Sequence, residues 1–289
     1  MKILVKVINK LYWLGGIGVI GGFLDQPILK WFLLFFLIGI LDFILSLIIV
    51  LRTETDNEMV NSLKFLFQNL GILFGIPVIY LRNLFRLPNP SNFKSKLPYS
   101  LPFDGLWIVA NGGITKETSH SWNICSQRYA YDFYIQENGR TFRNNGKKLN
   151  DYLCYGEPVL AAVNGTVVEI QDLFEDTPIG ESGEAICSAS DVRGNYIIIQ
   201  HSKREYSMTA HIKRGSFCVK EGEKVRRGQQ IACCGNSGNT SEPHIHFQVQ
   251  QGKSFLLSAS LPIKFERIKN HTTKENSDIR RGDLVENFI

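Results

Sequence analysis

The stretch that decides the fold reads PHIHFQVQ and covers residues 243–250. Polar and apolar residues alternate along it, which is typical of a β-strand with one face on a hydrophobic core. Because side chains two residues apart share a face, His244 and His246 point to the same side, about 6–7 Å apart. Two histidines in this spacing are a weak signal by themselves, since surface histidines produce the same pattern. Their meaning depends on the rest of the chain.

Outward from this stretch, the chain after residue 100 repeats the same two-residue period in short segments separated by Gly, Asn and Asp. This pattern predicts an antiparallel sheet or open barrel with one long insertion, residues 172–194. We expect the domain to cover residues 99–268 and a polar tail to follow over 269–289. The expected strands, besides the histidine strand at His244–Gln250, are Leu106–Ala110, Ala130–Gln136, Val159–Ala162, Thr166–Gln171, Asn195–His201, Tyr206–Ile212 and Gln230–Cys234.

The amino-terminal part is strongly apolar instead. Residues 31–51 contain a single charge, Asp42, and this run is long enough as a helix to cross a hydrocarbon core of about 30 Å. Residues 65–81 and 12–24 are further candidate spans. The sequence therefore predicts a membrane-anchored, mostly-β protein, with two or three transmembrane helices in residues 1–86 and a linker over 87–98.

Overall composition excludes some functions. The net charge of +5 on 289 residues includes no block of Lys or Arg, so nucleic acid is not an expected partner. The six cysteines form no CxxC pair, which argues against a zinc ribbon or a thioredoxin-type redox site, and their disulfide state stays open.

The charges that flank the predicted spans bear on the orientation in the membrane. For three spans the flanking Lys and Arg residues divide evenly between the two sides of the membrane, and for two spans they favour a cytoplasmic domain. Orientation is therefore not determined by charge.

An acidic residue within an apolar strand points to a site. Asp132 lies in QRYAYDF, residues 127–133, and a carboxylate in such a strand needs a partner or a cation. His211 ends another expected strand. Asp132 with His246 and one more histidine would form a set of two nitrogens and one oxygen with an open position, which is typical of a catalytic zinc site.

Four ordered motifs then carry a resemblance that covers roughly residues 100–265. They are GNYIIIQH at 194–201, YSMTAH at 206–211, the hairpin VKEGEKVRRGQQI at 219–231 and GNSGNTSEPHIHFQV at 235–249. This set resembles the lysostaphin and LytM-type zinc metalloendopeptidases, which cut peptides of bacterial peptidoglycan. The resemblance implies that Asp132 and His246 are zinc ligands. It also implies that His211 and His244 are catalytic, polarising the attacked carbonyl or the zinc-bound water.

One position departs from the family pattern. The third ligand of the family is a histidine four residues before the aspartate, where this chain has Arg128, and a guanidinium has no lone pair to offer a metal. His120 resembles a histidine that precedes the QRYAYD string in one branch of the family. We therefore predict a Zn²⁺ site formed by His120, Asp132 and His246. Either the chain bends or bulges before Tyr129, or Arg128 turns its charged end to solvent along its flexible stem.

The expected function is hydrolysis of peptide bonds in peptidoglycan by a metal-activated water. Two alternatives remain open. The first is a degenerate domain that acts as a non-catalytic binding or activating module, and the second is a membrane-bound protease for a secreted peptide. We expect a multi-pass protein of the cell membrane whose N-terminal spans contact lipid. Its domain would lie outside the cytoplasm, with peptidoglycan or another extracytoplasmic peptide as partner.

Overall fold

The computed structural model describes residues 56–180, 189–273 and 278–288, together with the single positions 14, 17, 35 and 185. The predicted spans over 12–24 and 31–51 therefore lie almost wholly outside the described residues. Helix α5 (Asp56–Arg82) contains the remaining predicted span, residues 65–81. A compact unit begins at Asn61 and extends to Ile289, so most of α5 belongs to the same unit as the β-domain.

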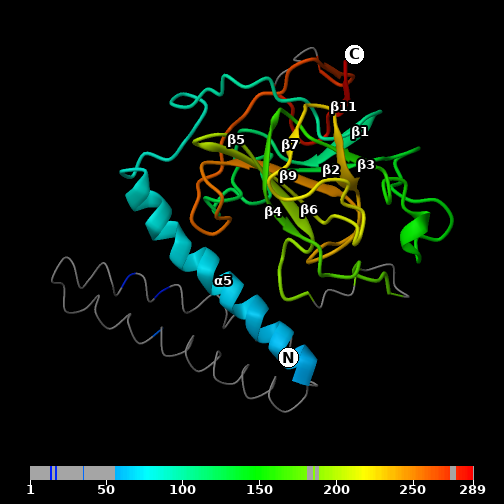
Figure 1. The fold of residues 1–289 in the computed structure, drawn as a ribbon, viewed down its shortest axis with the longest axis horizontal. Coiled ribbons are helices and arrows are strands. Elements are labelled where there is room, and N and C mark those ends of the chain that lie inside the picture. Colours follow the sequence, from blue (N-terminus) through cyan, green and yellow to red (C-terminus); the bar gives the residue numbers. More distant parts are fainter. Residues whose placement is uncertain are drawn as a thin grey trace. The chain divides into compact units, whose positions relative to one another are not determined.

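The domain contains a nine-stranded sheet in the order β10-β11-β1-β2-β9-β6-β5-β4-β7, and every strand pair in it is antiparallel (Figure 1). Strands β3 and β8 form a separate small sheet. The predicted antiparallel, mostly-β architecture is confirmed. The strands are β1 (Trp107–Asn111), β2 (Tyr131–Tyr134), β3 (Pro158–Leu160), β4 (Gly165–Gln171), β5 (Tyr196–Ser202), β6 (Glu205–Ala210), β7 (Lys224–Val225), β8 (Gln230–Cys233), β9 (Ile245–Gln250), β10 (Ile268–Asn270) and β11 (Leu284–Asn287), and a short 3-10 helix covers Leu149–Asp151.

The main core lies between the large sheet and the small one. Ile245, Phe247 and Val249 of β9 are fully buried in the same cluster as Val159 of β3 and Ile231 of β8. Because side chains alternate across a strand, the polar residues of β9 are left on the opposite face of the large sheet. The alternation that identified β9 therefore also determines which face carries the histidines.

The carboxyl-terminal boundary predicted from sequence is wrong. Strand β11 pairs with β1 through Trp107 and Val285, and β10 pairs with β11, so the sheet continues well beyond residue 268. Val285 is fully buried, and the Asn287 side chain donates to the carbonyl of Phe103 at 2.6 Å. The strand is only four residues long and half of it is polar, so its local pattern is too short to reveal it.

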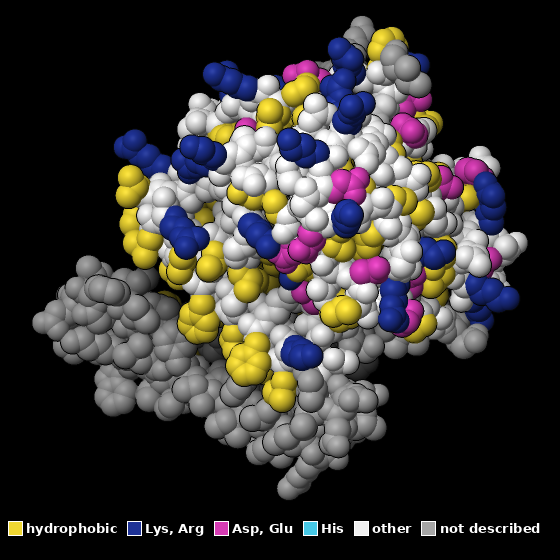
Figure 2. Space-filling view, in the orientation of Figure 1, with side chains coloured by type: hydrophobic (Ala, Val, Ile, Leu, Met, Phe, Trp, Pro, Cys, Tyr) yellow, Lys and Arg dark blue, Asp and Glu magenta, His cyan; other side chains and the backbone are white. Residues whose placement is uncertain are grey.

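Helix α5 is long and apolar enough to cross a membrane. One side of it nevertheless packs on the domain. Ile79 is buried in a small cluster with Cys125 and Ala259, and Gly75 lies so close to the Leu256 carbonyl that a Cβ there would be 2.1 Å from its oxygen. The other side exposes the large apolar side chains that follow the course of α5 in Figure 2, which are Phe67, Leu73, Phe74 and Leu81, and just beyond the helix Leu84 and Phe85.

His201 of β5 is a neutral histidine within the fold. Its Nδ1 lies 2.9 Å from the Asn164 carbonyl and its Nε2 lies 2.8 Å from the Ser207 hydroxyl. A carbonyl only accepts, so Nδ1 carries the proton and Nε2 accepts from Ser207. Burial lowers the pKa of His201 to about 4, against an opposing contribution of the Asn164 carbonyl. Protonation of Nε2 would require the Ser207 hydroxyl to turn and accept, and it would place a charge in this largely buried position.

This histidine predicts a specific pH dependence of stability. The unfolded chain binds a proton on His201 near pH 6.5 and the folded chain only near pH 4, so this stability is complete above 6.5 and is lost as pH falls through that window. We expect a loss of about 2 to 3 kcal/mol by pH 4.5. His201→Gln keeps a donor and an acceptor but does not titrate. Unfolding measured at pH 7.5 and 4.5 should show a smaller acid loss in this variant, and equal losses would contradict the assignment.

Candidate metal centre

The centre of the site is a pair of residues on neighbouring strands. Asp132 of β2 and His246 of β9 are direct partners in the antiparallel register, although 114 residues separate them in sequence. Paired residues on one face of a sheet have their Cβ atoms about 5 Å apart. Here His246 Nδ1 lies 2.9 Å from Asp132 Oδ1, and both side chains are buried. The sheet register therefore brings a carboxylate and an imidazole together.

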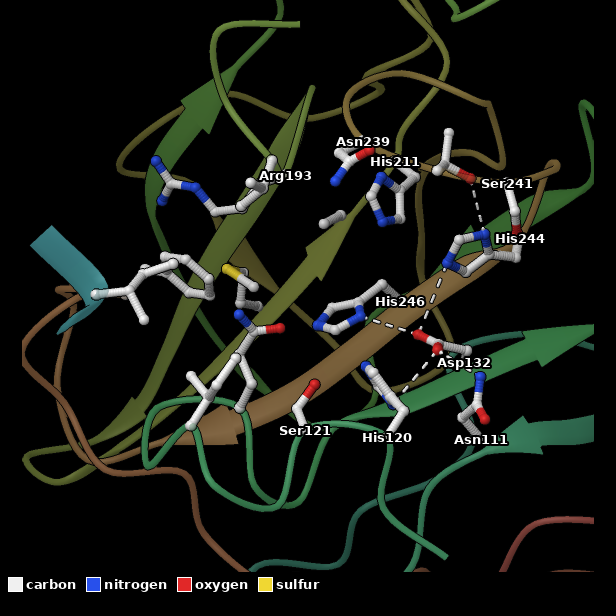
Figure 3. Close-up of a pocket in the computed structure, with 18 of the residues that line it drawn as sticks. Asn111, His120, Ser121, Asp132, Arg193, His211, Asn239, Ser241, His244 and His246 are labelled. Carbon is white, nitrogen blue, oxygen red and sulfur yellow. Dashed lines mark hydrogen bonds and ion pairs between the residues drawn. The ribbon is translucent and has the colours of Figure 1, made fainter. Parts of the chain in front are cut away.

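The loop before β2 brings in His120, as Figure 3 shows. His120 Nδ1 lies 3.6 Å from Asp132 Oδ2, and one potential ligand atom from each of His120, Asp132 and His246 lies within 4.8 Å of the other two. The His120 side chain is 31% exposed, whereas the other two are nearly closed to solvent. The structure thus places His120 beside Asp132, where the sequence analysis expected it.

Arg128 points to a different partner. Its Nε donates to the Trp122 carbonyl at 2.9 Å, and its guanidinium carbon lies 5.0 Å from the centre of the Trp122 ring. The Arg128 carbonyl accepts from the Ser119 hydroxyl, which ties the two ends of the loop together next to His120. Residues 121–129 form turns and not strand, so of the two possibilities that the sequence left open the chain adopts the bend. The bend keeps the guanidinium away from the cluster.

Two further histidines lie at the same cavity. His244 Nε2 is 3.6 Å from Asp132 Oδ1, and His244 Nδ1 is 2.8 Å from the Glu242 carbonyl. The ring of His244 stacks on Tyr134, with the centroids 5.1 Å apart, and the His211 centroid lies 4.6 Å from that of His244. All four residues that the resemblance implied therefore converge, together with His120.

His211 has an unusual backbone. Its φ is +62°, a left-handed conformation that a residue with a side chain adopts only when its surroundings hold it. Its amide donates to the Arg193 carbonyl at 3.0 Å, and its Nδ1 lies 2.7 Å from the Ser237 carbonyl. Since the Ser237 carbonyl accepts, the proton is on Nδ1 and the lone pair of Nε2 is available.

Two glycines allow the backbone to approach closely behind His211. A Cβ on Gly194 would lie 2.3 Å from the Ser237 carbonyl carbon, and one on Gly238 would lie 2.4 Å from the Gly194 nitrogen. Both have positive φ. The GNSG motif at 235–238 therefore has a structural explanation, since it seats the Ser237 carbonyl against His211.

The electrostatics favour a bound cation. Burial by itself would raise the pKa of Asp132, but the hydrogen bond from His246 and the neighbouring His244 outweigh it and hold this pKa well below its usual range. Burial lowers the pKa of both His211 and His244, in the second case against the attraction of Asp132. Burial likewise lowers the pKa of His120. At neutral pH the Asp132 carboxylate is therefore ionised and the His120 imidazole is neutral, which are the protonation states that a metal needs.

These donors fit Zn²⁺ in number and type. Zinc bonds of about 2.0–2.2 Å in a tetrahedral site leave ligand atoms roughly 3.3 Å apart. The three candidate ligand atoms, all within 4.8 Å of one another, need only modest movement to reach that spacing. They face a cavity of about 350 Å³, which leaves room for a further ligand and a substrate.

Comparison with known proteins places the chain in a family. A model described as peptidase family M23 matches residues 146–256. Lipoprotein NlpD of Yersinia enterocolitica is 34% identical over 100 residues, which cover 34% of this chain and 84% of that protein. The chain belongs to peptidase family M23. The resemblance expected from the four motifs is thereby confirmed.

Other M23 relatives are similar over smaller shares of their length. Peptidoglycan DD-endopeptidase ShyA of Vibrio cholerae serotype O1 is 36% identical over 92 residues, which cover 30% of this chain and 21% of ShyA. Murein hydrolase activator NlpD of Salmonella typhimurium is 36% identical over 166 residues, 57% of this chain and 39% of that protein. The chain thus spans less than half of the length of either relative.

Sequence reasoning missed some residues of the M23 site. Asn111 Nδ2 lies 3.2 Å from Asp132 Oδ2 and orients the carboxylate, and Tyr134 supports His244. Tyr134 lies two residues after Asp132, so the strand period could have placed it on the same face. Asn111 follows an expected strand, but only the β1–β2 register shows that it faces Asp132.

Proposed function

We propose that this M23 protein is a zinc-dependent endopeptidase that hydrolyses peptide bonds in bacterial peptidoglycan. The observation that supports this most strongly is the convergence of His120, Asp132 and His246 with His211 and His244 at one cavity. A domain released from catalysis has no physical need to keep a buried carboxylate among four imidazoles. The similarity to ShyA, named as a peptidoglycan DD-endopeptidase, supports the proposed substrate.

The proposed mechanism assigns a role to each side chain. His120, Asp132 and His246 would hold the metal, which when bound supplies a water of lowered pKa and polarises the substrate carbonyl. His211 and His244 each commit Nδ1 to a backbone carbonyl, so their Nε2 atoms are free to exchange a proton or to hold the carbonyl oxygen. Asn111 orients Asp132.

We further propose that the domain lies outside the cytoplasmic membrane, where peptidoglycan occurs, and that the N-terminal part contacts lipid. The apolar exposed side of α5 supports the contact with lipid.

Digestion of purified peptidoglycan tests this function. The full chain in detergent micelles, loaded with zinc, should convert cross-linked muropeptides into products that have gained one water, as mass spectrometry would show. A chelator should abolish the reaction and added Zn²⁺ should restore it, because the attacking water is activated only when the metal is bound.

Two results would contradict the proposal and favour an alternative. Binding to peptidoglycan without cleavage, combined with activation of a separate hydrolase, would indicate a module of the kind that the Salmonella relative is named for. Cleavage of a secreted peptide but not of peptidoglycan would indicate a processing protease.

A further inference from the structure

Besides its packing near Ile79 and Gly75, helix α5 contacts the loop before β5 through one glutamine that makes two hydrogen bonds. Gln68 Nε2 donates to Asp191 Oδ1 at 2.7 Å, and Gln68 Oε1 accepts from the Val192 amide at 2.7 Å. Both polar groups of this side chain are thus bound to the loop before β5. One turn further along the helix, Ile72 lines the metal-site cavity. The helix is therefore part of the surroundings of the site.

The loop that Gln68 contacts is held by hydrogen bonds between two of its own residues. Asp191 accepts from the Arg193 side chain at Nε (3.0 Å) and at its terminal nitrogen (2.7 Å), and also from the Arg193 amide at 2.9 Å. The guanidinium lies 3.8 Å from the centre of the Tyr196 ring. Such a bidentate pair restricts the loop geometrically. A displacement of Asp191 would therefore move Arg193 with it.

Arg193 in turn holds His211. The Arg193 carbonyl accepts from the backbone amide of His211, whose φ is +62°. The opposite side of His211 is held by the Ser237 carbonyl on Nδ1. These two hydrogen bonds stabilise the left-handed backbone conformation of His211. A continuous series of contacts therefore runs from α5 through Asp191 and Arg193 to His211.

We propose that Gln68 is a positioning residue for His211: it holds the Asp191–Arg193 turn so that the Arg193 carbonyl keeps the His211 ring aimed at the cavity. The proposal rests on the catalytic role of His211 in the proposed function. According to this proposal, α5 is a component of the active site, because the orientation of the His211 side chain depends on the contact of α5 with the domain.

The test uses Gln68→Met in the full chain in detergent micelles, since methionine keeps the length of the side chain and removes both hydrogen bonds. The matched control is Asn83→Leu just after α5, because the Asn83 side chain donates to the Ile79 carbonyl within the helix and not to the loop before β5. We expect kcat on peptidoglycan peptides to fall about 10- to 100-fold in Gln68→Met, with KM and zinc content unchanged. The control should match the wild type.

Hydrogen exchange provides a readout that does not depend on activity. Exchange of the backbone amides in residues 191–195 and 207–214, measured by mass spectrometry, should accelerate in Gln68→Met and not in Asn83→Leu. An effect confined to α5, with kcat and the 207–214 amides at wild-type values, would overturn the proposal and leave Gln68 as an anchor. Equal effects in both variants would overturn it too. If the wild type hydrolyses nothing, the proposed function fails, and the exchange result still decides whether Gln68 positions His211.

Discussion

Replacing Asp132 or His246 with alanine should remove bound zinc and reduce peptidoglycan hydrolysis about 10³-fold or more. The proposed site takes three protein ligands from the part of the chain that the structure describes, so the loss of one would leave too few to fix an open catalytic site. The several kcal/mol that a metal contributes to the transition state correspond to this factor. Metal analysis per chain and muropeptide release would be measured together. Asp132→Asn, which keeps the shape of the side chain and the contact with Asn111, should also lose zinc.

A matched histidine variant serves as control. His271 bonds Glu286 at 2.9 Å in another part of the sheet, so His271→Ala should keep both zinc and activity. Full activity in the Asp132 or His246 variant would contradict the metal assignment. Loss of the cooperative thermal transition would instead show that the variant had not folded, and Asp132→Asn would then decide the question.

The third ligand is tested within the same series. His120→Ala should lower zinc affinity, and the double variant His120→Ala/Arg128→His should not restore it. The side chain at 128 is directed to Trp122, so a histidine there lies away from Asp132. Restoration of zinc by the double variant would show that the family's usual ligand position is still functional. Unchanged zinc affinity in His120→Ala would remove this residue from the ligand set.

Replacing His211 or His244 with alanine should leave zinc bound while kcat falls by about 10²–10⁴, the range for a removed proton-transfer or oxyanion group. Neither ring belongs to the compact three-residue set, and each binds a backbone carbonyl through Nδ1. Metal content and steady-state kinetics at neutral pH separate the two effects. If both variants lost zinc, the two histidines would belong to the metal-binding set.

Much of the fold could be predicted because alternation is a local property. The period of two in residues 243–250 identified β9 and placed His244 and His246 on one face, and the same signal located the other long strands. Strands β10 and β11 were not predicted, because each is too short to show a period of two. Their positions depend on the pairing of β11 with β1 and of β10 with β11, which no local pattern records.

By itself, the sequence determined which side chains are chemically able to form the site. Lone pairs, charge and strand period single out Asp132, His244 and His246 and exclude Arg128 as a ligand. The roles of His120 and His211 were implied by the family resemblance. Only the tertiary structure decided how they meet. The β2–β9 register joins Asp132 to His246 across 114 residues, and the bend held by Ser119 and Trp122 delivers His120. Contacts between distant segments also bring Gln68 of an apolar helix to the loop that supports His211. Such contacts depend on the packing of the whole domain, which the local residue pattern does not encode.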